Sequence, residues 1–160
     1  MAIQVGERIP DVKLRTINQE GKRDISTGEL FRGRRVVLFG VPGAFTGTCS
    51  NRHLPGFVDH ADEIRARGVD LIACTAVNDI DVLNAWAREH GASDKIVLLA
   101  DGNGEFAHAM GLELDMRPFG MGVRSQRYGA IVEDGVVKAL HLDRPGEVTG
   151  SGAEALLAEL

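Results

Sequence analysis

The chain alternates short apolar runs with longer amphipathic segments. Three continuous runs of β-branched and aliphatic residues are typical of strands that are buried on both faces of a sheet. These runs are RVVLFGV at 35–41, VDLIACTAV at 69–77 and KIVLLA at 95–100. The pattern therefore predicts three central, parallel strands.

A helical pattern follows the first of these strands. The segment 48–67 has an apolar face that includes Phe57 and Ile64, and Gly68 is placed to end it. Pro55 lies inside the segment, where a proline removes a backbone hydrogen bond and its ring clashes with the preceding turn. We therefore expect Pro55 to kink this helix or to break its first turns.

The remaining elements follow from shorter patterns. The stretch 127–143 predicts a hairpin, because two alternating runs meet at Asp134-Gly135, a strong turn signal. An alternating stretch at 11–17 fits an exposed or edge strand. Further helices are predicted over 26–31, 78–91, 103–111 and 152–160.

The order of these elements defines a fold class. Strands alternate with helices up to the third apolar run, and a hairpin and a final helix follow. This order predicts a single α/β domain over 1–160, with a central mixed β-sheet flanked by helices in the thioredoxin-like arrangement. In open α/β sheets, sites form where the carboxyl end of a strand meets the next helix. Cys49 lies at such a place, directly after the strand at 35–41.

Composition and charge narrow the class of protein. Hydrophobic residues make up 44% of the chain and charged residues 26%, an ordinary globular balance. The net charge of −5 argues against nucleic-acid binding, because an acidic chain gains nothing from phosphate neutralisation. No signal-peptide pattern opens the chain, and no run reaches the ~18–20 apolar residues of a membrane helix. Only two cysteines are present, so a reducing, cytoplasmic location is expected.

Cys49 lies in a polar, turn-rich stretch, VPGAFTGTCSNRH at 41–53. The start of a helix offers unpaired N–H groups and partial positive charge, and both favour a thiolate. Position alone leaves two interpretations open, a buried structural cysteine and an activated nucleophile.

The neighbours of Cys49 add candidate chemistry. Thr46 lies three residues earlier, and its hydroxyl can donate to a thiolate and accept from a substrate O–H, although it also suits a helix N-cap. His53 shares a helical face with Cys49 and is either a base, a stabiliser of the thiolate or a packed residue bonded to backbone. No Cys-x-x-Cys motif and no further ligands at metal spacing are present. A dithiol reductase and a metal site are therefore disfavoured.

The motif PGAFTGTC resembles the active-site pattern Pro-x-x-x-Thr-x-x-Cys of the peroxiredoxins, with Pro42, Thr46 and Cys49 at the fixed positions. The resemblance is to the type II, or five-type, atypical subgroup. It continues through VNDIDVLNAWAREH, LLADGNGEFAHAMGL and GVRSQRYGAIVEDGVVKAL and covers almost the whole chain. It implies a thioredoxin-like fold and reduction of hydrogen peroxide and organic hydroperoxides by a peroxidatic cysteine. It also implies that no metal or organic cofactor takes part.

The resemblance further implies a role for each residue of the motif. Cys49 is the nucleophile that becomes a sulfenic acid, Thr46 holds the thiolate and the peroxide, and Pro42 packs over the site and limits water access. An arginine from a later strand completes the pocket. We assign this arginine to Arg127, with Arg124 as the nearby competitor. His53 then takes a secondary role.

Two departures from the family pattern concern the loop and the second cysteine. Gly47 stands where many members have proline, which is expected to loosen the loop before Cys49. The resolving cysteine of some animal members is absent from the corresponding region, GEVTGSGAEALL at 146–157. Cys74 is either a small buried strand residue or, as in some plant-like members, a second redox cysteine.

These observations predict a thiol peroxidase with a one-cysteine cycle. An external thiol is expected to reduce the sulfenic acid, with glutathione and glutaredoxin as the first choice and thioredoxin as the second. A peroxide sensor that passes oxidation to a partner uses the same cysteine and is the alternative. A redox-inert scaffold is the third hypothesis. The resemblance also implies a homodimer whose interface borders the active-site loop.

Overall fold

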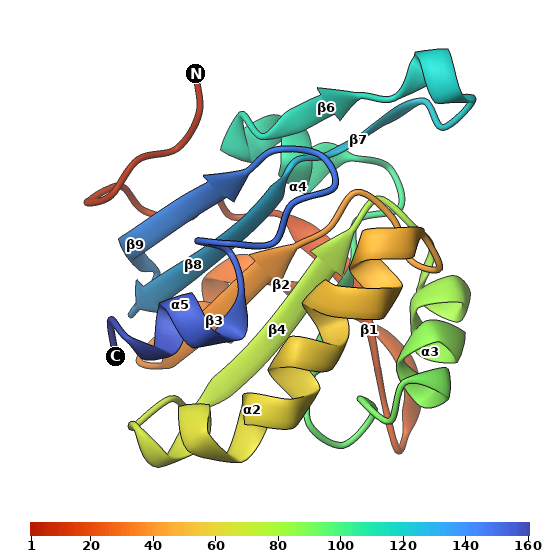
Figure 1. The fold of residues 1–160 in the computed structure, drawn as a ribbon. Coiled ribbons are helices and arrows are strands. Elements are labelled where there is room, and N and C mark those ends of the chain that lie inside the picture. Colours follow the sequence, from red (N-terminus) through yellow and green to blue (C-terminus); the bar gives the residue numbers. More distant parts are fainter.

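The computed structural model describes residues 1–160 and shows a layered α/β architecture (Figure 1). One sheet contains β1 (Lys13–Asn18), β2 (Gly21–Ser26), β3 (Arg35–Gly40), β4 (Leu71–Ala76), β5 (Val97–Ala100), β8 (Arg127–Glu133) and β9 (Val136–Asp143). The helices are α1 (Thr27–Phe31), α2 (Leu54–Ala66), α3 (Ile80–Glu89), α4 (Glu105–Met110) and α5 (Ala153–Leu157). The seven strands are ordered β2-β1-β5-β4-β3-β8-β9. This mixed sheet flanked by helices confirms the predicted thioredoxin-like fold class.

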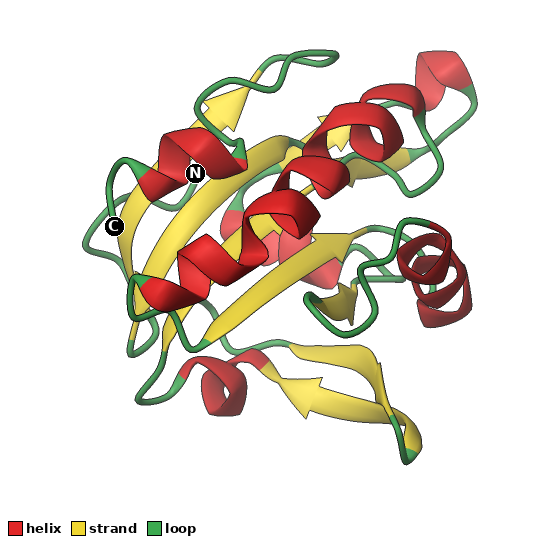
Figure 2. Ribbon diagram, turned by 60° about the horizontal axis from the view of Figure 1, so that its bottom comes forward, coloured by secondary structure: helices red, strands yellow, loops and turns green.

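The three predicted central strands are β3, β4 and β5. They pair in parallel, with Phe39 opposite Cys74 and Cys74 opposite Leu98. Because side chains alternate across a strand, successive residues of β3 enter two different cores. Val37 and Phe39 face the core under α2, α3 and α5, while Val36 and Leu38 face the core under α1 and α4. Figure 2 shows α2 lying along one face of the sheet.

Of the two alternatives expected for the first strand, the edge position is wrong, whereas the exposure of alternate β1 residues fits the other. β2 pairs with β1 in an antiparallel hairpin and takes the edge position, with Leu14 opposite Ile25. β1 contacts β5 on its other side, where Arg15 lies opposite Ala100. None of the residues of β2 is buried, and its sequence, GKRDIS, accordingly shows no alternation of apolar and polar residues. Its strand conformation comes from pairing, which the hydrophobic pattern does not report.

The predicted C-terminal hairpin is confirmed as β8–β9. Asp134 and Gly135 both have positive φ, 48° and 79°, as a two-residue type I′ turn requires. A second, smaller hairpin was not predicted. It consists of β6 (Glu113–Asp115), a 3₁₀ turn (Arg117–Phe119) and β7 (Val123–Ser125), and it projects from the body of the molecule (Figure 1).

The segment predicted as one helix over 48–67 is helical without a gap over 47–66. A π-helical turn (Cys49–His53) precedes α2, and the Leu54 N–H donates to the Cys49 carbonyl. Pro55 lies in the first turn of α2, where a missing N–H is tolerated, so the disturbance expected near this proline takes the form of the π turn and not of a break. Gly68 follows α2 with φ +90°. None of the helices combines the length and apolar character that a membrane span requires.

Candidate active site

Cys49 lies where the carboxyl end of β3 leads into the helical layer. Two hydrogen bonds anchor the connecting loop to the neighbouring strand and its extension. Val41 N–H donates to the Thr75 carbonyl at 3.1 Å, and Ala44 N–H donates to Asn78 Oδ1 at 2.9 Å. Cys49 itself is fully buried. The sulfur is therefore held in a dry position at the edge of the parallel strands.

Arg127 contacts the sulfur directly. It is the first residue of β8, which pairs with β3, and its Nη2 donates to Cys49 Sγ at 3.0 Å. Only 3% of the arginine is exposed. A guanidinium is always charged, and burial without a counter-charge is costly, so this geometry favours a thiolate at Cys49. The structure places Arg127, the residue assigned from the sequence, directly beside Cys49.

His53 contacts Arg127 rather than the sulfur. Its Nδ1 lies 2.8 Å from Arg127 Nη1, and its Nε2 lies 3.0 Å from the Ser151 carbonyl oxygen. An arginine only donates and a carbonyl only accepts, so the ring must carry its proton on Nε2 and accept at Nδ1. Burial lowers the pKa of His53 to about 4, which keeps the ring neutral at pH 7. Because Arg127 occupies the Nδ1 lone pair, His53 is not placed to act as a base for Cys49.

The Nε atom of the Arg127 guanidinium has no partner within the protein. Nη1 contacts His53 and Nη2 donates to Cys49, while the buried Nε makes no hydrogen bond. A buried, unsatisfied donor on a charged group is unfavourable. The contacts to His53 and Cys49 are therefore the ones that fix the guanidinium.

Thr46 and Pro42 lie in the loop over the site. The Thr46 hydroxyl donates to the Gly43 carbonyl at 2.7 Å and makes no hydrogen bond to Cys49 Sγ. With its proton engaged, the hydroxyl oxygen keeps lone pairs that can accept from a substrate O–H. The Thr46 carbonyl also accepts from Ser50 N–H at 2.9 Å, so this residue begins the helical segment. Pro42 is buried within the same loop.

Arg124, the competing arginine, supports the loop from outside. Its Nε donates to the Met121 carbonyl at 2.8 Å, and its Nη1 donates to the Pro42 carbonyl at 3.5 Å. No hydrogen bond joins it to the sulfur. The structure therefore separates the two arginines by role: Arg127 lies at Cys49, and Arg124 braces the loop that carries Pro42.

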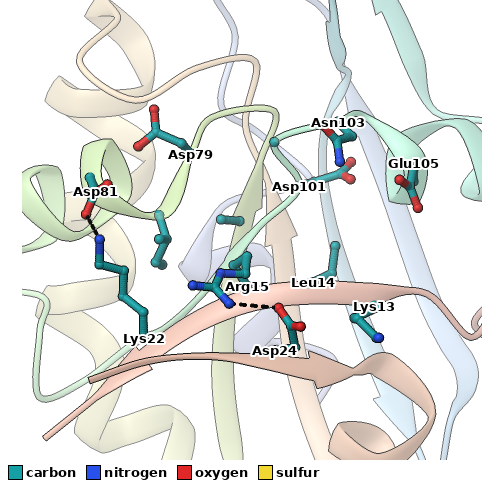
Figure 3. A pocket seen from close by; sticks show the side chains of 13 residues that line it. Lys13, Leu14, Arg15, Lys22, Asp24, Asp79, Asp81, Asp101, Asn103 and Glu105 are labelled. Atoms are coloured by element: carbon teal, nitrogen blue, oxygen red, sulfur yellow. Dashed lines mark hydrogen bonds and ion pairs between the residues drawn. The ribbon is translucent and has the colours of Figure 1, made fainter. Parts of the chain in front are cut away.

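A hollow of about 500 Å³ lies between the β1–β2 edge and the first residues of α3 and α4 (Figure 3). Four of its eight charged side chains form two ion pairs, Arg15 with Asp24 at 3.0 Å and Lys22 with Asp81 at 2.6 Å. It contains no cysteine or histidine. No group of three or more His, Cys, Asp or Glu side chains in the molecule is placed to hold a metal ion. The arrangement around Cys49 is therefore the candidate active site.

Comparison with known proteins gives the family. The Redoxin family model matches residues 4–157. Chloroplastic Peroxiredoxin-2E of Arabidopsis thaliana is 46% identical over 99% of this chain and 70% of its own length. Peroxiredoxin-2C of Oryza sativa subsp. japonica is 42% identical over 99% of this chain and 98% of its own length. The chain belongs to the peroxiredoxin family.

Solved peroxiredoxins share the whole fold. The crystal structure of reduced Prx3 from Vibrio vulnificus in complex with H₂O₂ has a TM-score of 0.93 and 46% identity, covering 98% of each chain. These matches confirm the predicted thiol peroxidase class and agree with the type II subgroup. The arrangement at Cys49 suits this chemistry, since a buried sulfur with fixed cationic donors can attack a peroxide and stabilise the departing oxygen.

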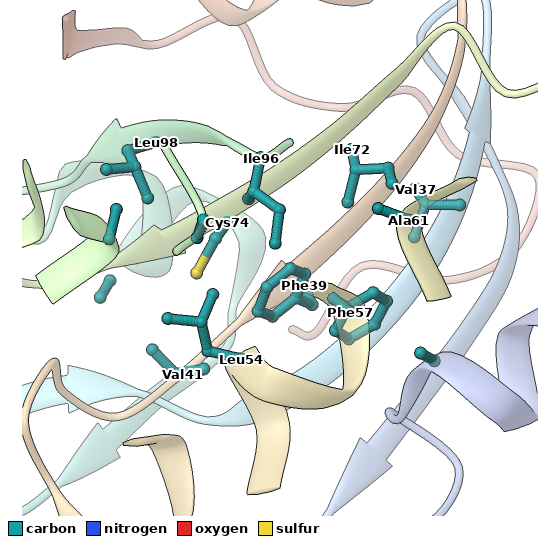
Figure 4. Close-up of a cluster of buried hydrophobic side chains, with 14 of the residues drawn as sticks. Val37, Phe39, Val41, Leu54, Phe57, Ala61, Ile72, Cys74, Ile96 and Leu98 are labelled. Carbon is teal, nitrogen blue, oxygen red and sulfur yellow. The ribbon is translucent and has the colours of Figure 1, made fainter. Parts of the chain in front are cut away.

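Cys74 of this peroxiredoxin lies in the core beneath the site. Its side chain packs among Phe39, Leu54 and Leu98, within the cluster that also contains Cys49 (Figure 4). Burial raises the pKa of the Cys74 thiol well above its usual value, the charge of Cys49 adds to this effect, and Arg127 opposes it. Both cysteines are free. At neutral pH, Cys74 therefore remains a protonated, apolar core residue.

Gly47 stands where many peroxiredoxins carry proline, and the space around it is free for a side chain. Gly47 is the first helical residue before Cys49, its N–H makes no hydrogen bond, and a Cβ there would have no heavy atom within 4 Å. Proline is favoured at the first position of a helix, where its missing N–H and fixed φ cost nothing. Glycine at this position therefore gives the unfolded chain more conformational freedom, although the folded structure does not require a glycine there.

We predict that Gly47→Pro stabilises the protein. The gain comes from lower entropy of the unfolded chain and amounts to about 0.4–1 kcal/mol. For a domain of this size the melting temperature rises by roughly 1–4 °C. Differential scanning calorimetry measures the change, with Gly47→Ala as the control that adds a side chain without the ring. A lower melting temperature for the proline variant would show that the loop needs a backbone angle that proline cannot adopt.

Proposed function

We propose that Cys49 is the residue at which this peroxiredoxin reduces hydrogen peroxide and alkyl hydroperoxides. The observation that carries the proposal is the 3.0 Å contact between Arg127 Nη2 and the buried Cys49 Sγ. The thiolate attacks one peroxide oxygen, a sulfur–oxygen bond forms and the oxygen–oxygen bond breaks. Cys49 becomes a sulfenic acid, and the second oxygen leaves as water or an alcohol after taking up a proton.

Three groups around Cys49 contribute to this step in different ways. Arg127 stabilises the thiolate before attack and the negative charge on the departing oxygen during it, because its guanidinium lies directly against Cys49 Sγ. The Thr46 hydroxyl oxygen accepts a hydrogen bond from the peroxide O–H and so orients it. Pro42 and the anchored loop exclude water, which strengthens each of these interactions. Neither a metal nor an organic cofactor is needed.

The cycle closes when an external thiol attacks the sulfenic acid. Water is released and a mixed disulfide forms, and a second thiol then releases Cys49 as the thiolate. We take glutathione with glutaredoxin as the reductant and thioredoxin as the second choice. The burial of Cys74 supports this one-cysteine cycle, because a protonated thiol within a central strand is a poor nucleophile.

Turnover with each donor tests the proposed function. Hydrogen peroxide consumption is measured with glutathione and glutaredoxin, and in parallel with thioredoxin and its reductase. Steady consumption over many equivalents supports the peroxidase. A single stoichiometric oxidation with no turnover under every donor would favour a peroxide sensor that passes oxidation to a partner.

We predict that Cys74→Ala keeps most of the activity with glutathione and glutaredoxin. The side chain is apolar in its surroundings, so alanine removes only a small buried group and leaves the site at Cys49 in place. Activity is compared with the wild type, and Cys74→Ser is measured alongside to show the effect of a buried hydroxyl. Loss of turnover in both variants, with melting curves that show intact folding, would make Cys74 a resolving cysteine.

A homodimer and a cytoplasmic location complete the proposal. Apolar side chains near the site support the dimer, since Phe45 of the loop is 50% exposed and Phe119 at the tip of the small hairpin is 74% exposed. Analytical ultracentrifugation tests it, and a species of monomer mass at all concentrations would exclude it.

The cytoplasmic location rests on composition alone. Fractionation of cells that express the full chain tests it, and recovery only with organelles or membranes would exclude it.

A further inference from the structure

The buried polar contacts of the site continue behind His53 to Asp143, the last residue of β9. Its carboxylate accepts from Thr149 N–H at 2.7 Å and from Ser151 N–H at 3.1 Å, and also from the hydroxyls of both residues. Burial disfavours the charge, but these hydrogen bonds outweigh it and lower the pKa of Asp143 below its ordinary range. Asp143 is therefore ionised at neutral pH and folds the 144–151 loop back onto the end of its strand.

Ser151 joins this loop to the site. It is fully buried, and its carbonyl oxygen accepts from His53 Nε2. Direct contacts thus run in order from Asp143 through Ser151, His53 and Arg127 to Cys49. Within this series only Arg127 contacts the sulfur. His53, Ser151 and Asp143 make no hydrogen bond to it.

We propose that Asp143 is a positioning residue for peroxide reduction. It fixes the Ser151 carbonyl, the carbonyl fixes the His53 ring with Nδ1 as the acceptor, and Nδ1 holds Arg127 in its orientation against Cys49. The inference rests on the proposed role of Cys49 and adds a distant carboxylate to the groups on which that role depends.

The orientation of Arg127 depends on few contacts. Its Nε has no partner, so the hydrogen bonds to His53 and Cys49 are the ones that fix the guanidinium. If the Ser151 carbonyl moves, the His53 ring can place a proton on Nδ1, either as the other neutral form or as the cation. An N–H would then face the N–H of Arg127, and the arginine would lose its second contact.

Charged groups surround His53 on several elements, so the direction of a pH effect is informative. Arg127 on β8 lowers the pKa of His53, and Asp143 on β9 raises it, although burial is the largest influence. Cys49 lies on the preceding turn. The other titratable or charged groups lie around a hollow of about 250 Å³ beside the ring: Arg52, His60 and Glu154. Loss of the Asp143 charge alone would lower the pKa further, whereas release of the ring to water would raise it toward 6.5.

Asp143→Ala tests the proposal. Alanine removes the carboxylate and with it all four acceptor contacts to Thr149 and Ser151. We expect kcat/KM for hydrogen peroxide at pH 7 to fall roughly 10- to 100-fold, the scale of a misplaced catalytic group, with KM for the thiol donor unchanged. We also expect the pKa of the His53 ring, followed by its NMR signals, to rise from about 4 toward 6.5. An unchanged kcat/KM, or a His53 pKa that stays or falls, would overturn the proposal.

Asp70→Ala is the matched control. Asp70 also accepts a backbone hydrogen bond, from Arg35 N–H at 2.8 Å, but it lies where β3 begins, at the opposite end of that strand from the site. We expect this variant to lose stability while its kcat/KM and the pKa of its His53 ring stay unchanged. Equal changes in the two aspartate variants would mean that Asp143 acts only through stability.

A double-mutant cycle keeps the proposal testable if Asp143→Ala folds poorly. His53→Leu removes both contacts of the ring and so interrupts the series. We expect Asp143→Ala to add no further loss of kcat/KM in the His53→Leu background, measured per folded molecule. Additive losses would overturn the proposal. If wild-type Cys49 does not react with peroxide at all, the proposed function itself fails, and that result is distinct from both.

Discussion

Replacing Cys49 with serine is expected to abolish peroxide reduction. A serine hydroxyl stays protonated at neutral pH and is a much weaker nucleophile toward oxygen than a thiolate, even beside the Arg127 guanidinium. Loss of the attacking atom should lower kcat/KM by about 10³-fold or more. The measurement is hydrogen peroxide consumption with glutathione and glutaredoxin as the donor.

The control for this variant is Cys74→Ala, which removes the other thiol from the same apolar cluster. Calorimetry of both variants shows whether activity is lost because the reactive thiol is missing or because the protein unfolds. Substantial turnover by Cys49→Ser would contradict the account, because it would require a second group in the chain to accept the peroxide oxygen.

Replacing Arg127 is the second variant with a large expected effect. Arg127→Lys keeps the charge but replaces the two nitrogens that reach His53 and Cys49 by a single ammonium, which lacks the rigid fork of a guanidinium. We expect kcat/KM for hydrogen peroxide to fall by roughly 10²–10³-fold, the effect of removing one fixed donor to a developing negative charge. Thiolate absorbance at 240 nm and pH 7 should fall as well. Stopped-flow kinetics of peroxide consumption measures the first effect, and ultraviolet titration measures the second.

Arg124→Ala provides the comparison. Arg124 contacts carbonyl groups of the loop and of the small hairpin and does not reach the sulfur. Its loss should affect the position of the loop and leave the thiolate absorbance close to that of the wild type. If Arg124→Ala lowers both quantities more than Arg127→Lys does, the assignment of the two arginines is reversed.

The hydrophobic pattern predicted the strands that position Cys49. Strands β3, β4 and β5 are buried on both faces, so their apolar runs report their conformation directly. The Asp134-Gly135 turn likewise carries its own signal, because both residues must adopt positive φ. The strand β2 and the β6–β7 hairpin were not predicted. They are short or exposed, and their conformation depends on strand pairing rather than on burial.

The polar contacts of the site were less predictable. By pattern alone, Arg127 is a cation at the start of a strand, and its assignment depended on the family resemblance. Only the pairing of β8 with β3 brings it to Cys49, from 78 residues away in sequence. Ser151 had no sequence signal because it acts through its backbone carbonyl, 98 residues from His53. Contacts of this range and kind depend on the assembled fold and leave no local pattern.

The structure decides between the roles that the sequence left open for His53. Spacing placed it on the same helical face as Cys49, so a direct partnership was one of them. The π turn and the packing against Phe39 and Phe57, with ring centroids 5.0 and 5.5 Å away, instead aim its Nδ1 at Arg127. A buried neutral imidazole that orients the arginine is chemically distinct from a base that deprotonates the cysteine.

A single-turnover experiment tests the central claim most directly. Reduced protein is mixed with one equivalent of hydrogen peroxide in the absence of a thiol donor, trapped with dimedone and analysed by peptide mass spectrometry. The account predicts that one peroxide is consumed per chain, much faster than by free cysteine at the same pH, and that the trapped sulfenic acid lies on Cys49. Oxidation on Cys74, or no oxidation of Cys49, would contradict it.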